Sequence, residues 1–379
     1  MEHFNVTPWE VSGNVDYDKL LHQFGVKRID HILFNRLRKL SGERLHPMIR
    51  RNFVYAHRDL DLALNDYESG KGFFIYTGRG PSGPMHLGHL VPLLFNKWLQ
   101  ETFDLELHIQ ITDDEKFVYK QDAKWEDIDN FAKQNILDIA ALGFDPDKTF
   151  IFRDSEYIKN TYPLLLKIAK KITLSTARAT FGFQNETNLG LTFYPVYQIA
   201  TCFFDEKRCL VPCAIDQDPY FRLQRDIAES LGYKKTATIY SKFLPSLTGT
   251  TGKMSSSVGD TAIWLDDNEK AVKNKINKYA FSGGQSTVEE HRQKGGNADV
   301  DVSFQWLKIL FEPNEKKLKQ IEADYNMGKL LTGELKQILI DRVNEFLNQH
   351  RENRKKAEKE VEKYMYTGKL AKKMWGKKF

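Results

Sequence analysis

The chain has 379 residues, of which 41% are apolar and 28% charged, the composition of a globular protein with two or three domains. No apolar run approaches the roughly 18 residues that a membrane span needs, and the N-terminus lacks a signal-peptide core, so we expect no membrane partner. The three cysteines form neither an even disulfide set nor a zinc pattern, which predicts reduced thiols in a cytoplasmic protein.

Residues 1–72 are predicted to form a helical extension. Apolar residues recur there at three-to-four spacing in the segments 17–24, 29–40 and 47–67. Nothing in this part has the pattern of a catalytic motif.

Residues 73–266 alternate between strand-like and helix-like segments, as a parallel α/β sheet requires. The predicted strands are 73–76, 105–111, 149–152, 209–213 and 237–240, and the predicted helices include 87–103, 125–142, 163–173 and 222–231. Beyond residue 268 strand signals vanish, and an apolar stripe from Leu335 to Leu347 predicts a long helix. The sequence therefore predicts an α/β core followed by a helical part, residues 267–379.

The net charge of +5 is concentrated at the C-terminal end. Residues 351–379 hold eleven Lys and Arg against four Glu, so the rest of the chain is slightly acidic. Tyr364, Tyr366 and Trp375 are interleaved with these cations, which suits RNA phosphates and unstacked bases. The alternative is a solvated helix face followed by a disordered end. If the tail binds RNA, deleting residues 367–379 should weaken that binding and leave chemistry elsewhere intact.

The stretch from Phe73 to His89 has the pattern of a phosphate site. A predicted strand leads into a loop with three glycines and two prolines, and the loop leads into a helix. Backbone amides without Cβ atoms, next to a helix N-terminus, bind anions. His86 and His89, one helical turn apart, would stand over that site.

Gly78, Gly80 and Gly83 also spell the dinucleotide-binding pattern G-x-G-x-x-G after a strand. However, Pro81 and Pro84 interrupt the turn, and the helix starts too late for the third glycine to pack it against the strand. No acidic residue closes the second strand, as that pattern requires. A nicotinamide or flavin site is therefore the weaker hypothesis.

Two motifs indicate a different nucleotide chemistry. His86-Leu87-Gly88-His89 resembles the first signature of the class I aminoacyl-tRNA synthetases, in which both imidazoles hold ATP phosphates. Thr250 to Ser257, with Lys253-Met254-Ser255, resembles the second signature, the Lys-Met-Ser-Lys-Ser loop whose lysine reaches the β- and γ-phosphates. A P-loop does not fit, because Met254 follows the Gly-Lys pair where Ser or Thr is required.

This resemblance carries expectations for fold and charge. It implies a Rossmann-like catalytic domain at residues 73–266, which includes the Lys-Met-Ser loop, and an all-helical anticodon-binding domain with a basic tail at 267–379. Ser256 replaces the second lysine of the family motif, so its charge must come from elsewhere, and Lys116 is the candidate.

Three further segments are similar to the tryptophanyl-tRNA synthetase family in its eukaryotic and archaeal form. They are residues 76–82, 110–116 and 214–221. The resemblance extends from Pro8-Trp9 to the segment 331–335 and covers nearly the whole chain. One departure is the loop 82–85, which is shorter than usual and would alter how the loop closes over substrate.

The resemblance implies a two-step reaction at one site. The tryptophan carboxylate attacks the α-phosphorus of ATP to give tryptophanyl-adenylate and pyrophosphate, and the terminal 2′-hydroxyl of tRNA(Trp) then takes the acyl group. Because that carboxylate is already ionised at pH 7, the first step needs no general base, and catalysis rests on positioning and charge stabilisation. Mg²⁺ would bridge the phosphates through water, without a protein metal site. The family also implies a homodimer, and we expect no DNA partner.

The residues carried over from the family fall into three groups. The catalytic group is His86, His89, Lys116, Lys253, Ser255 and Ser257. The tryptophan-binding group is Tyr76 and Gln110 at the indole N–H, with Glu115, Gln198 and Gln217 at the amino and carboxylate ends. The ATP-binding group is Gly78, Arg79, Gly80, His86, Gly88, His89, Ala214, Asp216, Lys253 and Met254. A buried acceptor for the indole N–H would reject analogues that lack this group by roughly 10⁴–10⁵.

Two other functions remain open. A tyrosyl-tRNA synthetase shares both signatures but would aim a polar group at a phenol, so Gln110→Ala would leave its affinity for indole analogues unchanged. A non-catalytic paralogue would keep the fold for binding alone, although the intact histidine and lysine motifs argue against it. A charging assay separates a paralogue from an enzyme, and ATP–pyrophosphate exchange with each amino acid separates the two enzymes.

Overall fold

Seven strands form the central sheet, in the order β3-β4-β9-β8-β5-β6-β7. The computed structural model describes residues 5–6, 11–12, 16–249 and 261–379. The strands of the sheet are β3 (Lys27–Arg28), β4 (Val54–Arg58), β5 (Phe73–Arg79), β6 (Leu107–Ile111), β7 (Thr149–Arg153), β8 (Arg208–Ala214) and β9 (Ala237–Ser241). A separate antiparallel pair is formed by β1 (Asn5–Val6) and β2 (Val11–Ser12).

The five strands β5 to β9 run parallel and have the order of a doubly wound, Rossmann-like sheet. From β5 the chain adds β6 and β7 on one side, and it then returns to add β8 and β9 on the other. The sheet therefore has a switch point between β5 and β8, where such sheets bind ligands at the carboxyl ends of their strands. The expected fold class is confirmed, and each of the five strands predicted for residues 73–266 is present.

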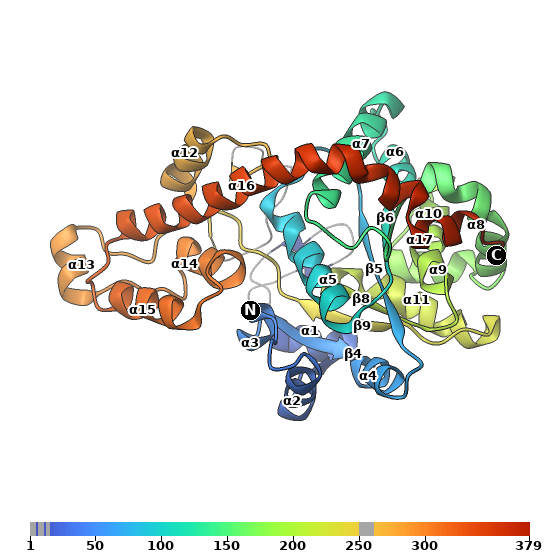
Figure 1. Cartoon of the computed structure of the whole chain (residues 1–379), viewed down its shortest axis with the longest axis horizontal. Coiled ribbons are helices and arrows are strands. Elements are labelled where there is room, and N and C mark those ends of the chain that lie inside the picture. Colours follow the sequence, from blue (N-terminus) through green and yellow to red (C-terminus); the bar gives the residue numbers. More distant parts are fainter. Residues whose placement is uncertain (1–4, 7–10, 13–15, 250–260) are drawn as a thin grey trace.

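Helices cover both faces of this sheet (Figure 1). Those that precede β9 are α1 (Tyr17–Phe24), α2 (His31–Leu40), α3 (Pro47–Arg50), α4 (Leu60–Glu68), α5 (Leu90–Phe103), α6 (Asp113–Tyr119), α7 (Trp125–Ala140), α8 (Asp154–Ala169), α9 (Leu174–Phe181), α10 (Leu189–Ala200) and α11 (Asp218–Ala228). Residues of α4, α5 and α7 pack into the core on one face, and those of α8, α10 and α11 on the other. No helix of the described part is both long and apolar enough to cross a membrane.

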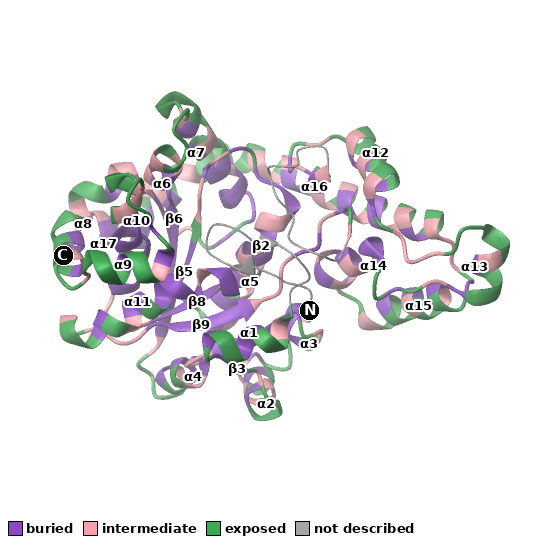
Figure 2. Cartoon of the chain, turned by 180° about the vertical axis from the view of Figure 1, so that it is seen from behind, coloured by how far each residue is buried: buried purple, intermediate pink, exposed green. Residues whose placement is uncertain are grey.

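The strands are buried on both faces because their side chains alternate between two apolar cores (Figure 2). On β5, Phe73 and Ile75 belong to the core under α5, whereas Phe74 and Tyr76 belong to the core under α8 and α10. This explains why the sequence of β5 is a continuous apolar run instead of an alternating one.

The segment 47–67 does not form the single helix that its apolar spacing predicted. It forms α3, β4 and α4, and β4 pairs antiparallel with β9 to extend the main sheet. Asn52 and Asp59 take left-handed backbone conformations, which Asn and Asp tolerate, and they separate the three elements. The N-terminal part is thus joined to the main sheet by β4, and the packing shows no break at the predicted division at residue 72.

Beyond residue 268 the described chain contains helices and no strand, as the sequence predicted. These helices are α12 (Glu269–Tyr279), α13 (Val288–Lys294), α14 (Val302–Trp306), α15 (Glu315–Asn326), α16 (Thr332–Glu362) and α17 (Lys369–Trp375). Figure 1 shows α16 running from the group α13–α15 to the sheet-containing part of the molecule. There it packs against α7, where His350 and Arg354 contact Asp138.

The basic C-terminal tail is folded onto the sheet-containing part of the molecule. Leu370, Ala371 and Met374 of α17 are buried in the core beside α8. The three aromatic residues expected to stack on bases form hydrogen bonds within the protein: Tyr364 donates to Phe144 O, Tyr366 to Glu156 and Trp375 to Met365 O. The alternative prediction, a solvated helix face followed by a disordered end, is therefore wrong about the end of the chain, whereas RNA binding by the tail stays a prediction.

His108 on β6 is surrounded by aromatic rings, and we expect its titration to lower the free energy of unfolding at acidic pH. Its ring has edge contacts with Phe74, Phe150 and Phe204, and burial lowers its pKa from 6.5 to about 3. Because the folded pKa lies below the unfolded one, the unfolded chain binds an extra proton between about pH 6.5 and 3, and stability is lost as the pH falls through this window. At pH 5 the cost is about 2 kcal/mol relative to pH 7.5.

We expect this loss to disappear in His108→Phe, which cannot titrate. The free energy of unfolding of both proteins is to be measured by urea denaturation at pH 7.5 and pH 5. The free energy of unfolding of the variant minus that of the wild type should be about 2 kcal/mol larger at pH 5 than at pH 7.5. Parallel pH dependences would contradict the prediction.

Candidate active site

A cleft of about 500 Å³ opens at the carboxyl ends of β5, β8 and β9. Its walls come from the end of β5, the loop that leads to α5, the start of α6, one side of α10 and the turn between β8 and α11. The cleft therefore occupies the switch point of the sheet, where a doubly wound fold places its ligand.

His86 and His89 form one wall of this cleft, with stacked rings whose centroids are 3.7 Å apart. His86 Nδ1 accepts a hydrogen bond from the Gly88 N–H (3.1 Å), and His89 Nδ1 accepts one from the His86 N–H (3.0 Å). An accepting Nδ1 carries no proton, so each neutral ring has its proton on Nε2. Burial, followed by the charge of Arg79, lowers the pKa of His86 to about 3. The pair thus supplies N–H donors from neutral rings.

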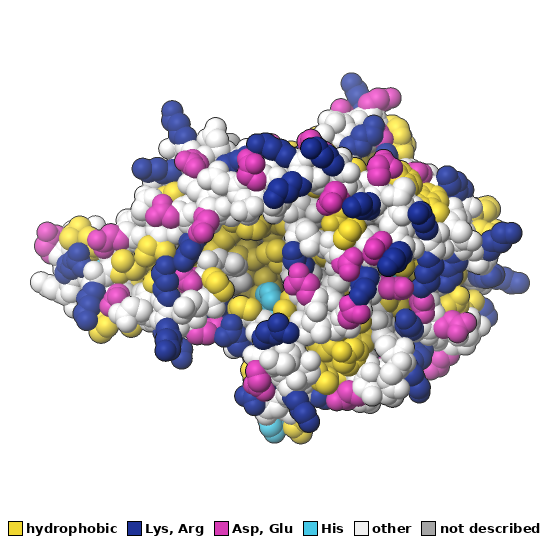
Figure 3. All heavy atoms as spheres, viewed as in Figure 1, with side chains coloured by type: hydrophobic (Ala, Val, Ile, Leu, Met, Phe, Trp, Pro, Cys, Tyr) yellow, Lys and Arg dark blue, Asp and Glu magenta, His cyan; other side chains and the backbone are white. Residues whose placement is uncertain are grey.

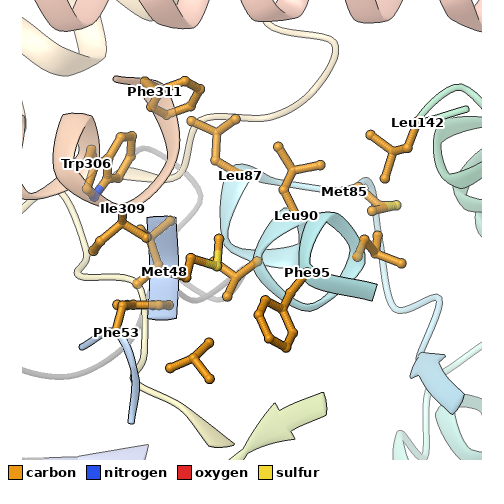
Figure 4. Packing of buried hydrophobic residues seen from close by; sticks show 14 of the residues in the cluster. Met48, Phe53, Met85, Leu87, Leu90, Phe95, Leu142, Trp306, Ile309 and Phe311 are labelled. Carbon is orange, nitrogen blue, oxygen red and sulfur yellow. The ribbon is translucent and has the colours of Figure 1, made fainter. Parts of the chain in front are cut away.

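The turn that carries the histidines is anchored on two sides. Leu87 is fully buried, and Figure 4 shows this turn and α5 packed among residues from the N-terminal segment and from α14. The Leu87 N–H donates to Ile263 O (3.0 Å), and the Leu265 N–H donates to Met85 O (2.9 Å). The segment 263–265, which follows the Lys-Met-Ser motif in sequence, is therefore fixed beside the histidines.

The loop after β5 brings Arg79, Gly80 and Lys116 together. The Arg79 guanidinium donates to carbonyls of residues 80–84, and burial lowers its pKa to about 10, so it remains charged at neutral pH. Lys116 passes over the bare Cα of Gly80, and its Nζ lies 2.6 Å from Glu115 Oε1. This part of the cleft presents two cations beside glycine backbone, as a polyphosphate site requires.

A second part of the cleft is walled by aromatic rings. Tyr76, Tyr194, Tyr220 and Phe221 line it and are almost completely buried. Gln198 of α10 lies among them, with its Oε1 accepting from the Tyr194 hydroxyl. A flat aromatic group fits such walls better than an aliphatic one does.

Gln110 stands one layer behind the aromatic wall. It is fully buried and is not among the residues that line the cleft. Its Oε1 accepts from the Tyr76 hydroxyl (2.5 Å), and its Nε2 donates to Asp154 (2.8 Å). In this structure Gln110 therefore reaches the cleft only through Tyr76.

Most of the site residues named from the sequence meet in this one cleft. They are Tyr76, Gly78, Arg79, Gly80, His86, Gly88, His89, Glu115, Lys116, Gln198, Ala214, Asp216 and Gln217. Lys253, Met254, Ser255 and Ser257 lie outside the described residues, together with Ser256.

The structure also adds lining residues that the sequence did not indicate. Tyr220 and Phe221 belong to the segment 214–221 but were given no role, Tyr194 is an ordinary core aromatic in the sequence, and Lys242 follows β9 without any motif. Trp264, whose ring meets that of His86 at a centroid distance of 5.7 Å, is likewise undistinguished in sequence. Only the pairing of residues 85–87 with 263–265 brings it to the site, and no local pattern predicts such a pairing.

A doubly wound sheet with donors and bare backbone at its switch point defines a nucleotide-binding enzyme of the Rossmann-like class. Residues 68–348 match the family described as tRNA synthetases class I (W and Y). The chain belongs to this family.

Curated relatives and solved structures agree with that assignment. The chain is 59% identical over 376 residues to the tryptophan–tRNA ligase of Saccharolobus solfataricus and 58% identical over 376 residues to that of Sulfurisphaera tokodaii. Each alignment covers 99% of this chain and 99% of the relative. The crystal structure of Plasmodium falciparum tryptophanyl-tRNA synthetase superposes with a TM-score of 0.88 at 43% identity, covering 94% of this chain and 99% of that one.

Proposed function

We propose that this protein ligates tryptophan to tRNA(Trp), with ATP as the activating substrate. The observation that carries the proposal is the cleft itself, in which paired histidine donors adjoin an aromatic pocket with Tyr76 in its wall. Full-length identity of 53–59% to curated tryptophan–tRNA ligases supports it.

In the first step, the tryptophan carboxylate displaces pyrophosphate from the α-phosphorus of ATP. The negative charge that grows on the phosphate oxygens is met by the Nε2–H groups of His86 and His89 and by Lys116, with Lys253 carried over from the family motif. Gly78, Arg79, Gly80, Gly88, Ala214 and Asp216 shape the ATP side of the cleft, and Met254, Ser255 and Ser257 belong to the lysine loop. Since the nucleophile is already an anion, these groups act by positioning and by donating hydrogen bonds rather than by removing a proton.

Mg²⁺ is proposed as a companion of ATP and not as a resident metal. Among the described residues, no three His, Cys, Asp or Glu side chains gather where they could hold an ion. A bridge through water between the metal and the phosphates needs no such site. We therefore assign no step to a metal held by the protein.

The close passage of Lys116 over Gly80 leads to a prediction about ATP use. A Cβ on Gly80 would lie 2.1 Å from Lys116 Cε, which is the movable end of a side chain, so Gly80→Ala should fold normally and displace the ammonium. We expect kcat/KM for ATP in the exchange reaction to fall about tenfold, as for one weakened charged hydrogen bond. Gly83→Ala is the matched control, because its Cβ would meet nothing within 4 Å. Equal kinetics for the two variants would disprove this role of Lys116.

The choice of amino acid is proposed to rest on the aromatic pocket. Tyr76, oriented by Gln110, would meet the indole N–H, while Glu115, Gln198 and Gln217 would hold the amino and carboxylate ends. Discrimination would then follow from the cost of leaving a buried polar group without its partner. The second candidate function is tyrosine ligation, since the matched family includes both activities. It would require a polar partner for a phenol at the same place.

The helical part, residues 267–379, is proposed to bind the anticodon, and residues 73–266 to be the catalytic domain. Lys355, Lys356 and Lys359 of α16 are exposed, and Figure 3 shows many Lys and Arg side chains along the upper edge of the molecule, which suits tRNA phosphates. A tRNA(Trp) with a substituted anticodon should be charged more slowly. Equal charging of the substituted and natural tRNA would contradict this assignment.

A homodimer is part of the proposal and is supported by an apolar stripe on α8. Ile158, Tyr162 and Leu166 recur at a spacing of four and are 38%, 54% and 50% exposed. We expect Tyr162→Glu to convert a dimer into a monomer, as judged by molar mass from light scattering. Ile32→Glu, which alters a residue of α2 that is 67% exposed, should leave the molar mass unchanged. A wild-type monomer, or a dimer that survives the change at Tyr162, would rule out this interface.

The proposed reaction belongs in the cytoplasm, where translation consumes charged tRNA. The direct test of the proposed function is aminoacylation of tRNA(Trp) with radiolabelled tryptophan in the presence of ATP and Mg²⁺. Charging with tryptophan supports it, and the absence of charging with an intact, folded protein favours the non-catalytic alternative.

A further inference from the structure

Behind the aromatic wall of the cleft, three buried side chains form a hydrogen-bonded row. Tyr76 is in the wall, Gln110 lies behind it, and Asp154 at the start of α8 lies behind Gln110. The Tyr76 hydroxyl is 2.5 Å from Gln110 Oε1, and Gln110 Nε2 is 2.9 and 2.8 Å from the two oxygens of Asp154. All three are almost inaccessible to solvent, so each polar atom depends on its protein partners.

The surroundings of Gln110 allow only one orientation of its amide. The Nε2 end faces acceptors, namely the Asp154 carboxyl and the Tyr197 carbonyl at 3.4 Å. The Oε1 end faces hydroxyl donors, namely Tyr76 and, at 3.4 Å, Thr201. A turned amide would set N–H against the hydroxyls and leave the Tyr197 carbonyl facing another oxygen.

This orientation decides what Tyr76 can offer to the cleft. Its oxygen lies near two protein acceptors, Gln110 Oε1 at 2.5 Å and the Gln198 carbonyl at 2.9 Å, but it has a single proton to donate. Burial raises the pKa of Tyr76 well above 10, so the proton stays on the phenol. With the proton directed inward, the hydroxyl oxygen has only acceptor capacity left for a ligand.

Asp154 is itself fixed from behind by Asp114. Burial raises the pKa of both carboxyls, and their mutual contact raises that of Asp154 further, so the pair retains a proton between them at neutral pH. The neighbouring Asp113 differs, because Arg153 and Ser155 satisfy it. Asp154 thus keeps an oxygen that accepts from Gln110 Nε2, and the retained proton lowers the negative charge of the pair behind the pocket.

We propose that Asp154 is a positioning residue for amino-acid selection: it fixes the Gln110 amide, and through it the Tyr76 proton, so that the Tyr76 oxygen accepts an N–H from the substrate ring. The inference rests on the proposed function and names the buried group that enforces its specificity. It further assigns the ring contact to Tyr76 and an orienting role to Gln110.

The test compares tryptophan with β-(benzothiophen-3-yl)alanine, which has sulfur in place of the ring N–H and nearly the same shape. The ratio of kcat/KM for the two amino acids in ATP–pyrophosphate exchange measures recognition of the N–H alone. In Asp154→Ala the Gln110 amide is free to turn and donate to Tyr76, so we expect this ratio to fall at least about tenfold, the effect of one lost hydrogen bond. A purely structural role would lower both rates and leave their ratio unchanged.

Asp154→Asn is the conservative variant. Its amide oxygen accepts from Gln110 and its NH₂ donates to Asp114, so we expect it to keep the wild-type ratio within about threefold. If Asp154→Ala does not fold, Asp154→Leu replaces it, because leucine fills the volume of the carboxyl with apolar atoms. A tenfold lower ratio in the asparagine variant would overturn the inference. A ratio equal to that of the wild type in the alanine or leucine variant would also overturn it.

A double variant locates the effect at Tyr76. Tyr76→Phe removes the acceptor, so adding Asp154→Ala to it should change the ratio no further. Additive losses would mean that Asp154 acts by another route. Tryptophan-dependent exchange by the wild-type protein separates the two claims. If it is absent, the proposed function and this inference both fail. If the variants are active and their ratios are unchanged, only the inference fails.

Discussion

Deletion of residues 367–379 is expected to abolish amino-acid activation and tRNA charging together. The deletion removes α17, whose Leu370, Ala371 and Met374 are buried against the sheet, and it uncovers Tyr157, whose hydroxyl donates to Met374 O at 2.7 Å. Losing the burial of Leu370 and Met374 and exposing the surface that they cover costs on the order of 5 kcal/mol, a large part of a typical folding free energy. Thermal unfolding and both half-reactions are to be measured on the same preparations.

The control for this deletion is the double variant Lys372→Gln and Lys378→Gln, which removes exposed charge and keeps the apolar contacts. It should melt within a few degrees of the wild type and retain activation. A deleted protein that melts like the wild type and still forms adenylate, but binds tRNA weakly, would contradict the structural role of the tail and support the RNA-binding hypothesis.

The second large effect is expected at His89. Its Nδ1 accepts from the His86 N–H and holds the turn, whereas its Nε2–H is the donor proposed to meet the phosphate. Asparagine places an acceptor near Nδ1 and has nothing at Nε2, and glutamine places an N–H near Nε2. We therefore expect His89→Asn to fold normally and to lose roughly 10²–10³ in the rate of adenylate formation, as for other lost transition-state donors.

His89→Gln should recover part of that rate, which makes the two substitutions a matched pair. Single-turnover adenylate formation at saturating ATP separates this loss of rate from weaker binding. Wild-type rates in the asparagine variant would show that the histidine pair organises the turn and contributes nothing to phosphate chemistry.

The predictable part of the fold follows from strong local patterns. The five parallel strands are short segments rich in apolar and β-branched residues between turn residues, so their predicted bounds agree with the structure to within three residues. The prediction of one helix for the segment 47–67 is wrong because apolar spacing of this kind is compatible with a helix. Pairing with the open edge of β9 makes residues 54–58 a strand. The start of α8 was placed at Pro163 instead of Asp154, because a proline that usually marks a first turn lies inside this helix.

The site shows the same division between local and long-range information. The histidine turn and the glycine loop are contiguous in sequence, so resemblance to a motif was enough to assign them. The layer behind the pocket is different, because Tyr76, Gln110 and Asp154 come from two strands and a helix start and meet only after the sheet has formed. The role of the tail also depends on long-range packing, since its charge pattern is indistinguishable from that of an RNA-binding segment.

The central claim is that one cleft holds ATP at the paired histidines and an indole between the aromatic walls. The most direct measurement is ATP–pyrophosphate exchange by the wild-type protein with tryptophan and with tyrosine at equal concentrations. The account predicts exchange that depends on tryptophan and is at least about 10⁴-fold less efficient with tyrosine. Exchange supported by tyrosine and not by tryptophan would contradict it.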